Sequence, residues 1–227
     1  MNFDSNTLRI LGILKDSFLP LLKAGLEFTV PLTLISFALG LVLALLTALA
    51  RISNITPLKL LARFYVSIIR GTPLLVQLFI IFFGLPTVGI TINPLTAAII
   101  GFTLSVGAYN SEVIRAAILS IPKGQWEAGF SIGMTYSQAL RRVILPQAAR
   151  VSIPPLANSF ISLVKDTSLA ATITVAEMFQ VAQRITATTY EPLFLYIEAA
   201  FIYYIFCTIL TTVQNKLENR LSRYTTR

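Results

Sequence analysis

The stretch of sequence that decides the fold reads Glu127-Ala128-Gly129-Phe130-Ser131-Ile132-Gly133 and continues, after nine further residues, with Val143-Ile144-Leu145-Pro146. The first part favours a short helix, and Gly133 permits a sharp turn or the close approach of another backbone. Pro146 has no N–H group and cannot continue a helix that began far upstream, so we expect the chain to stop and change direction there. The stretch therefore predicts two short helices, separated by a glycine and ended by a proline.

The composition around this stretch indicates a membrane protein. Of the 227 residues, 55% are hydrophobic and 12% are charged, and the mean hydropathy is +0.75. A soluble domain carries about 25% charged residues, so we expect lipid to surround most of the chain. Apolar runs near 20 residues long are the length that a helix needs to cross a bilayer. They predict an all-α membrane protein, with a single transmembrane domain over 1–227 and five spans at about 26–50, 64–84, 95–118, 156–178 and 193–213.

The distribution of Lys and Arg predicts how these spans are oriented. Basic residues are concentrated in 51–70, 115–150 and 216–227, whereas the opposite ends of the spans carry few. The positive-inside rule therefore places the N-terminus outside and the C-terminus in the cytoplasm, as an odd number of spans requires. The net charge of +8 then reflects topology, and no nucleic-acid partner is expected. The region of about 119–155 is the one cytoplasmic loop long enough to hold a docking element.

Residues that the chain lacks exclude several kinds of chemistry. A single cysteine, Cys207, allows no disulfide or cysteine-based metal site within one chain, and the absence of histidine excludes imidazole catalysis and ligation. There is no Gly-x-x-x-x-Gly-Lys-Ser/Thr motif, so any ATP must be bound by a partner. We expect no metal, no cofactor and no enzymatic activity in this chain.

Taken whole, the opening stretch resembles the EAA loop of the inner-membrane subunits of ATP-binding cassette importers. That loop reads Glu-Ala-Ala, three residues, Gly, nine residues and Ile-x-Leu-Pro. Two positions differ, because Gly129 replaces the second Ala, which would loosen the helix slightly, and Val143 replaces Ile. The matching positions are Glu127, Ala128, Gly133, Leu145 and Pro146.

Further stretches resemble the polar amino acid permeases, often called the histidine/glutamine-type family. They are Arg70-Gly71-Thr72-Pro73, residues 108–115, residues 123–128 and residues 158–169. The continuation Ala170-Ala171-Thr172-Ile173 looks like the permeases of cystine importers. The resemblance covers nearly the whole chain.

This resemblance implies a type I (MetI-like) permease fold in a bacterial cytoplasmic (inner) membrane and an importer of a polar amino acid, with L-cystine expected and glutamine, arginine or histidine as alternatives. Two ATPase subunits would bind ATP and Mg, and an extracytoplasmic binding protein would deliver the cargo. A second permease, identical or related, would complete a two-fold pathway. The loop would form a coupling helix in an ATPase cleft, through Glu127, Ala128, Gly129, Gly133, Val143, Leu145 and Pro146.

Polar residues of the predicted fourth span are candidates for the substrate pathway. Asn158, Ser162 and Asp166 are spaced four residues apart and share one helical face, and Lys165 is adjacent. Ionisable residues inside a span mark pathways or buried pairs. A zwitterionic amino acid needs one charge of each sign, which Lys165 and Asp166 would supply; alternatively, both are satisfied within the protein.

Other acids are assigned to helix ends. Glu112 and Arg115 lie three residues apart near the cytoplasmic end of the third span, which predicts a structural or gate-side ion pair. Glu177 and Glu198 are expected at solvated helix ends; alternatively, either meets the docked binding protein or a cationic group.

Two other classes of protein fit less well. A channel or ion-coupled secondary transporter often shows internal repeats, and this chain has none that we detect. A membrane enzyme would need a nucleophile with its base or spaced metal ligands, and neither pattern is present.

Overall fold

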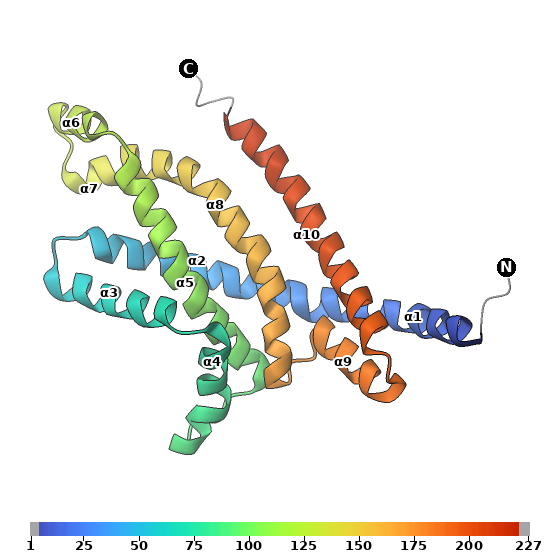
Figure 1. Ribbon diagram of the computed structural model, residues 1–227. Coiled ribbons are helices and arrows are strands. Elements are labelled where there is room, and N and C mark those ends of the chain that lie inside the picture. The colour runs from blue at the N-terminus through green and yellow to red at the C-terminus, as the bar shows by residue number, and fades with distance from the viewer. Residues whose placement is uncertain (1–4, 223–227) are drawn as a thin grey trace. The chain divides into compact units, whose positions relative to one another are not determined.

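The computed structural model describes residues 5–222, with side chains through Asn219. Every element in this part of the chain is a helix (Figure 1), which confirms the all-α class. In chain order the elements are α1 (Ser5–Ala24), η1 (Gly25–Thr29), α2 (Val30–Ile52), α3 (Thr56–Gly71), α4 (Leu74–Phe79), η2 (Ile80–Gly84), η3 (Leu85–Val88), α5 (Pro94–Ser120), α6 (Lys123–Ser131), α7 (Tyr136–Ala139), η4 (Leu140–Ile144), α8 (Leu145–Asp166), η5 (Thr167–Ile173), α9 (Met178–Thr189) and α10 (Pro192–Ser222). Of the short η segments, η1, η2 and η4 are π-helical, and η3 and η5 are 3-10 helical.

Within residues 5–222, three helices are long and apolar enough to cross a membrane, namely Ser5–Ile52, Pro94–Ser120 and Pro192–Asn219. The pair Thr56–Gly71 and Leu74–Val88 makes a fourth if it is counted as one span. The number of five spans and the sides on which the termini lie stay predictions. The terminal residues themselves, including the basic Arg223 and Arg227, lie outside the described part.

The helices differ from the predicted spans at three places, for different physical reasons. The first helix begins at Ser5 and not near residue 26, because charged side chains break the apolar run of α1 without breaking its helix. The segment 64–84 is not one helix: α3 ends at Gly71 and α4 begins at Leu74, and Pro73 between them has no N–H to continue a helix. The segment 156–178 is not one helix either, because α8 ends at Asp166 and η5 follows.

The chain divides into two compact units, each described by itself. The first unit comprises the N-terminal segment through Ser36, Leu74–Gly101 and Ile161–Thr212, and the second comprises Phe37–Pro73, Phe102–Phe160 and the C-terminal segment from Val213. The core of the first unit joins α1, α9 and α10 through Leu21, Met178, Ala182, Ala199 and Ile202.

The core of the second unit joins α2, α5, η4 and α8. It is rich in alanine, which allows the close helix approach that membrane helices use, and it contains Ala44, Ala48, Ile114, Ala117, Ile118, Ile121, Ile144 and Ala148. Gly40 extends this packing, since a Cβ atom there would lie 2.5 Å from Val106 Cγ1. This core supports the loop that follows α5.

Candidate functional site

The loop after α5 is a helical hairpin made of α6 and α7 (Figure 1). Gly133 forms its turn with a φ of 80°, in the left-handed region that glycine enters without strain. The turn is closed by the Met134 N–H, which donates to the Gly129 carbonyl at 3.1 Å. α7 then begins with a capping box, in which Thr135 and Gln138 satisfy each other's backbone N–H groups. The predicted first short helix and the turn at the glycine are confirmed.

Gly129 lies where the two short helices pack most closely. It is buried, and a Cβ atom at this position would lie 3.3 Å from Ala139 Cβ. Contacts that short require a neighbour to move by a few tenths of an ångström. The glycine that replaces the second alanine of the EAA pattern therefore favours close packing of α6 on α7. Glu127 and Ala128 are exposed on α6.

The expectation that Pro146 stops the helix is wrong. The backbone is helical without interruption from Tyr136 to Asp166, through α7, η4 and α8. The π turn η4 widens the helix just before the proline, and the Leu145 N–H donates to the Leu140 carbonyl, five residues back. The altered pairing lets the helix pass a residue that cannot donate.

The Val-Ile-Leu part of the loop motif anchors the hairpin. Ile144 is fully buried in the core of the second unit, and Val143 and Leu145 are partly buried against the same cluster. The other end of the hairpin exposes apolar surface. Phe130 is 47% exposed and Ile132 is 73% exposed, and exposed apolar patches of this kind mark contact surfaces.

The predicted ion pair between Glu112 and Arg115 is present, and it belongs to a larger cluster. Arg115 Nε and Nη2 donate to Glu112 Oε2 at 3.0 and 2.9 Å. Arg51, at the end of α2, donates to Glu112 Oε1, and Arg70, at the end of α3, lies 3.3 Å from the same atom. Arg70 also stacks over the Tyr109 ring, 5.3 Å from its centroid.

The candidate pathway residues of α8 have different surroundings. Asn158 accepts a hydrogen bond from Gln214 Nε2 at 3.0 Å. Ser162, Lys165 and Asp166 are exposed near the end of the helix. Of the α8 candidates, Lys165 alone lines a hollow of about 480 Å³.

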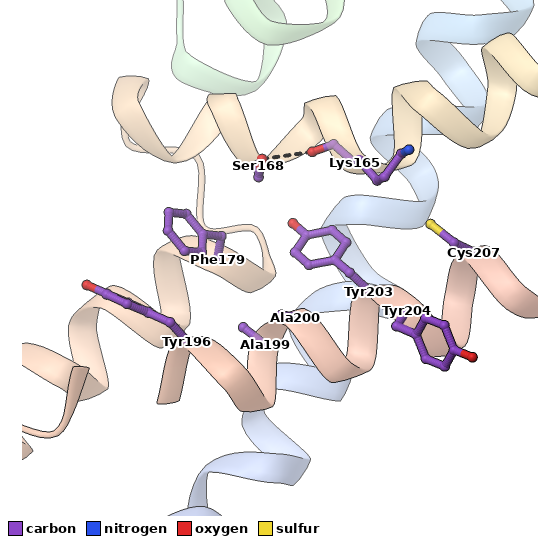
Figure 2. Close-up of a pocket in the computed structure, with 9 residues that line it drawn as sticks. All are labelled: Lys165, Ser168, Phe179, Tyr196, Ala199, Ala200, Tyr203, Tyr204 and Cys207. Carbon is purple, nitrogen blue, oxygen red and sulfur yellow. Dashed lines mark hydrogen bonds between the residues drawn. The ribbon is translucent and has the colours of Figure 1, made fainter. Parts of the chain in front are cut away.

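Aromatic side chains dominate the wall of this hollow. Figure 2 shows Lys165 and Ser168 on one side and Tyr203 facing them from α10, with its hydroxyl directed toward that side. The full set of lining residues is Lys165, Ser168, Phe179, Tyr196, Ala199, Ala200, Tyr203, Tyr204 and Cys207. A wall that combines one lysine with aromatic and apolar side chains suits a ligand with a carboxylate and an apolar or sulfur-containing body.

Residues 39–223 match the family described as the binding-protein-dependent transport system inner membrane component. The chain belongs to this family. The chain is 59% identical over 213 residues to the L-cystine transport system permease protein TcyB of Bacillus subtilis (strain 168), covering 93% of this chain and 91% of that protein. It is 38% identical over 205 residues to the glutamine transport system permease protein GlnP of Escherichia coli (strain K12), covering 89% and 94%.

A solved structure agrees with these relatives. The crystal structure of an amino acid ABC transporter with histidines matches this chain with a TM-score of 0.87 at 36% identity, over 97% of this chain and 100% of that chain. The importer permease fold that the EAA-like loop implied is therefore confirmed.

Several buried polar contacts differ from what the sequence predicted. Glu177 and Glu198 are buried, although solvated helix ends were expected. Glu177 accepts hydrogen bonds from the Tyr203 hydroxyl at 2.6 Å and from the Gln180 N–H at 2.8 Å, and Glu198 accepts one from Ser17. The Gln180 contact is the N-cap of α9, whereas Tyr203 and Ser17 lie on helices distant in sequence, so no local pattern indicates those two partners.

Proposed function

We propose that this chain is the permease subunit of an ATP-driven importer that moves L-cystine into the cytoplasm. The observation that carries the proposal is the α6–α7 hairpin, which is anchored through Ile144 in a buried core and presents Phe130 and Ile132 at its exposed end. Such a rigid apolar projection suits docking to a partner, and the chain has no nucleotide-binding motif of its own.

The proposed complex contains two ATPase subunits, which bind ATP and Mg²⁺, and two permeases, identical or related. An extracytoplasmic binding protein delivers the amino acid. Residues 1–227 form a single transmembrane domain of five spans in the bacterial cytoplasmic membrane, with the N-terminus outside. Membership of a family of inner membrane components supports this location.

In this mechanism the hairpin transmits the state of the ATPase. Glu127, Ala128 and the Gly133 turn enter the ATPase cleft, while Val143 and Leu145 hold the hairpin against the core. Because Tyr136–Asp166 is one continuous helix, movement of the hairpin is carried along α8. ATP shifts the permease outward only if it binds the closed ATPase pair more tightly than the open pair.

The cargo proposal rests on the 59% identity to a protein named as an L-cystine permease. The exposed Lys165 is proposed to receive the cargo carboxylate, with Asn158, Ser162 and Asp166 along the pathway. Glu112 and Arg115 are proposed to form a pair on the gate side. The alternative cargo is glutamine, arginine or histidine.

Uptake by the reconstituted complex tests the proposal. Proteoliposomes that contain the permease, its ATPase and the binding protein are expected to accumulate radiolabelled L-cystine only with internal ATP, and more than glutamine, arginine or histidine at equal concentration. Preference for one of the other amino acids would replace the cargo. Uptake by the permease alone along a sodium or proton gradient would replace the importer with an ion-coupled transporter.

Substitution of Lys165 tests the pathway. We expect Lys165→Met to reduce cystine uptake at least tenfold while ATPase co-purification stays normal, because only the charge that faces the carboxylate is lost. Arg184→Met, in the exposed part of α9, is the matched control and is expected to transport normally. Unchanged uptake kinetics in Lys165→Met would remove Lys165 from the pathway.

A further inference from the structure

Two stretches that the coupling loop does not use meet at one carboxylate in the second unit. The Arg70-Gly71-Thr72-Pro73 stretch ends α3, and residues 108–115 lie within α5. Arg70 and Glu112 connect them at 3.3 Å. We propose that Arg51, Arg70 and Arg115 form a binding site for a phosphate oxyanion, supplied by the headgroup of an anionic phospholipid.

The Glu112 carboxylate is already saturated with donors. Its Oε1 is shared by Arg51 and Arg70, and its Oε2 receives two N–H groups of Arg115. Each guanidinium has five N–H donors, so most donors of the cluster remain available. The Arg51 Nε atom is buried and has no hydrogen-bond partner. The cluster therefore has many donors and no remaining acceptor.

The charge of the cluster points to the same kind of ligand. Three guanidinium groups face one carboxylate, which leaves two positive charges uncompensated. The other acids in the described part of this unit are Glu127, which is exposed on α6, and Glu218, which accepts a hydrogen bond from Gln214. Guanidinium groups bind phosphate through paired, charge-assisted hydrogen bonds. One phosphate oxyanion would relieve the repulsion between these groups.

The surroundings indicate lipid as the source of the phosphate. α3 exposes Leu60, Leu61 and Phe64, each by 64% or more of its surface, and carries basic residues on another face. Such a helix suits contact with lipid chains on its apolar face and with anionic headgroups on its basic face. Arg70, at its end, is 43% exposed. The predicted topology places the cluster toward the cytoplasmic leaflet, where anionic headgroups attract Arg and Lys.

Lipid titration of the purified permease–ATPase complex tests the site. The complex is depleted of lipid in detergent and titrated with phosphatidylglycerol, and the bound lipid is counted by native mass spectrometry. Arg70→Gln with Arg115→Gln is expected to weaken binding at least tenfold. The single variant Arg115→Gln, which keeps the other two contacts to Glu112, is expected to weaken it several-fold. Arg63→Gln with Arg142→Gln removes the same charge outside the cluster and is expected to bind within twofold of the original.

Glu112→Gln best distinguishes a lipid-binding site from a purely structural cluster. It removes the competing anion at nearly constant shape, so phosphatidylglycerol should bind more tightly, whereas a purely structural cluster would bind lipid no better. Weaker or unchanged binding in Glu112→Gln, or equal losses in the control pair, would overturn the site. If low-millimolar inorganic phosphate displaced the lipid, the lipid assignment would be overturned in favour of soluble phosphate.

Discussion

Gly133 offers a way to separate backbone strain from charge at the proposed coupling surface. Its φ of 80° lies in the left-handed region, and a Cβ atom there would meet no other atom within 4 Å. Substitution therefore costs conformational strain without a clash, about 1–2 kcal/mol for alanine. Aspartate enters the left-handed region more readily than alanine. Gly133→Asp should thus be no less stable than Gly133→Ala, while it adds a carboxylate to the turn.

Gly133→Asp is expected to bind the ATPase more weakly than Gly133→Ala, although it should be at least as stable. Gly133→Ala should have a melting temperature a few degrees below that of the unsubstituted permease, and it should co-purify with a normal amount of ATPase. Gly133→Asp should lose at least nine-tenths of the bound ATPase, which corresponds to about 1.4 kcal/mol of binding free energy or more. Thermal unfolding in detergent and the molar ratio of ATPase to permease after purification measure the two quantities.

Gly124 provides the matched control. It lies in the first turn of α6, outside the left-handed region, and again no atom lies within 4 Å of a built Cβ. A carboxylate near a helix N-terminus is tolerated, so Gly124→Asp should keep its ATPase. If Gly124→Asp lost as much ATPase as Gly133→Asp, a charge anywhere on the hairpin would be sufficient. If Gly133→Ala lost as much, strain would explain the effect and the docking argument would fail.

Two further predictions concern packing and buried polar groups. Gly40→Leu is expected to destabilise the permease by about 1–3 kcal/mol or more, because even a Cβ there lies 2.5 Å from Val106, whereas Gly12→Leu, with open space around it, should be nearly neutral in the same melting experiment. Tyr203→Phe removes the hydroxyl that donates to the buried Glu177 carboxylate and should lower the free energy of unfolding by about 1–3 kcal/mol. Tyr204→Phe, at a 66% exposed side chain, should change it by no more than about 0.5 kcal/mol. Equal melting temperatures for the two variants would show that the Tyr203 hydrogen bond does not stabilise the fold.

The parts of the fold that sequence predicts well are those with a local cause. The run 95–118 matches α5 closely because it is long and mostly apolar, and its charged residues, Glu112 and Arg115, lie near its end. The turn at Gly133 follows from the one residue type that enters a positive φ freely. The end of α8 at Asp166 has no such signal. In the segment that follows, Thr167, Ala170 and Ile173 are fully buried, so packing favours the 3-10 geometry of η5.

In the candidate site, too, contacts within one helix are predictable from the sequence, and contacts between helices are not. The contact between Glu112 and Arg115 follows from their spacing within one helix. Arg51 and Arg70 reach the same carboxylate from α2 and α3, 61 and 42 positions away in the sequence. Only the tertiary fold brings them together, so a pair was predicted where a cluster is present.

The error at Pro146 changes how coupling is explained. A stop at this residue would have made the loop an independent arm, joined to the transmembrane part by a flexible turn. The uninterrupted helix from Tyr136 to Asp166 is instead about 45 Å long at 1.5 Å per residue. A helix that docks at one end resists bending except where its hydrogen bonding is weakened, and within this run those places are η4 and the pair Pro154 and Pro155. If the hairpin docks as proposed, its displacement reaches Lys165 unless the helix bends at one of these two places. A change at either place can therefore abolish coupling while docking to the ATPase stays normal.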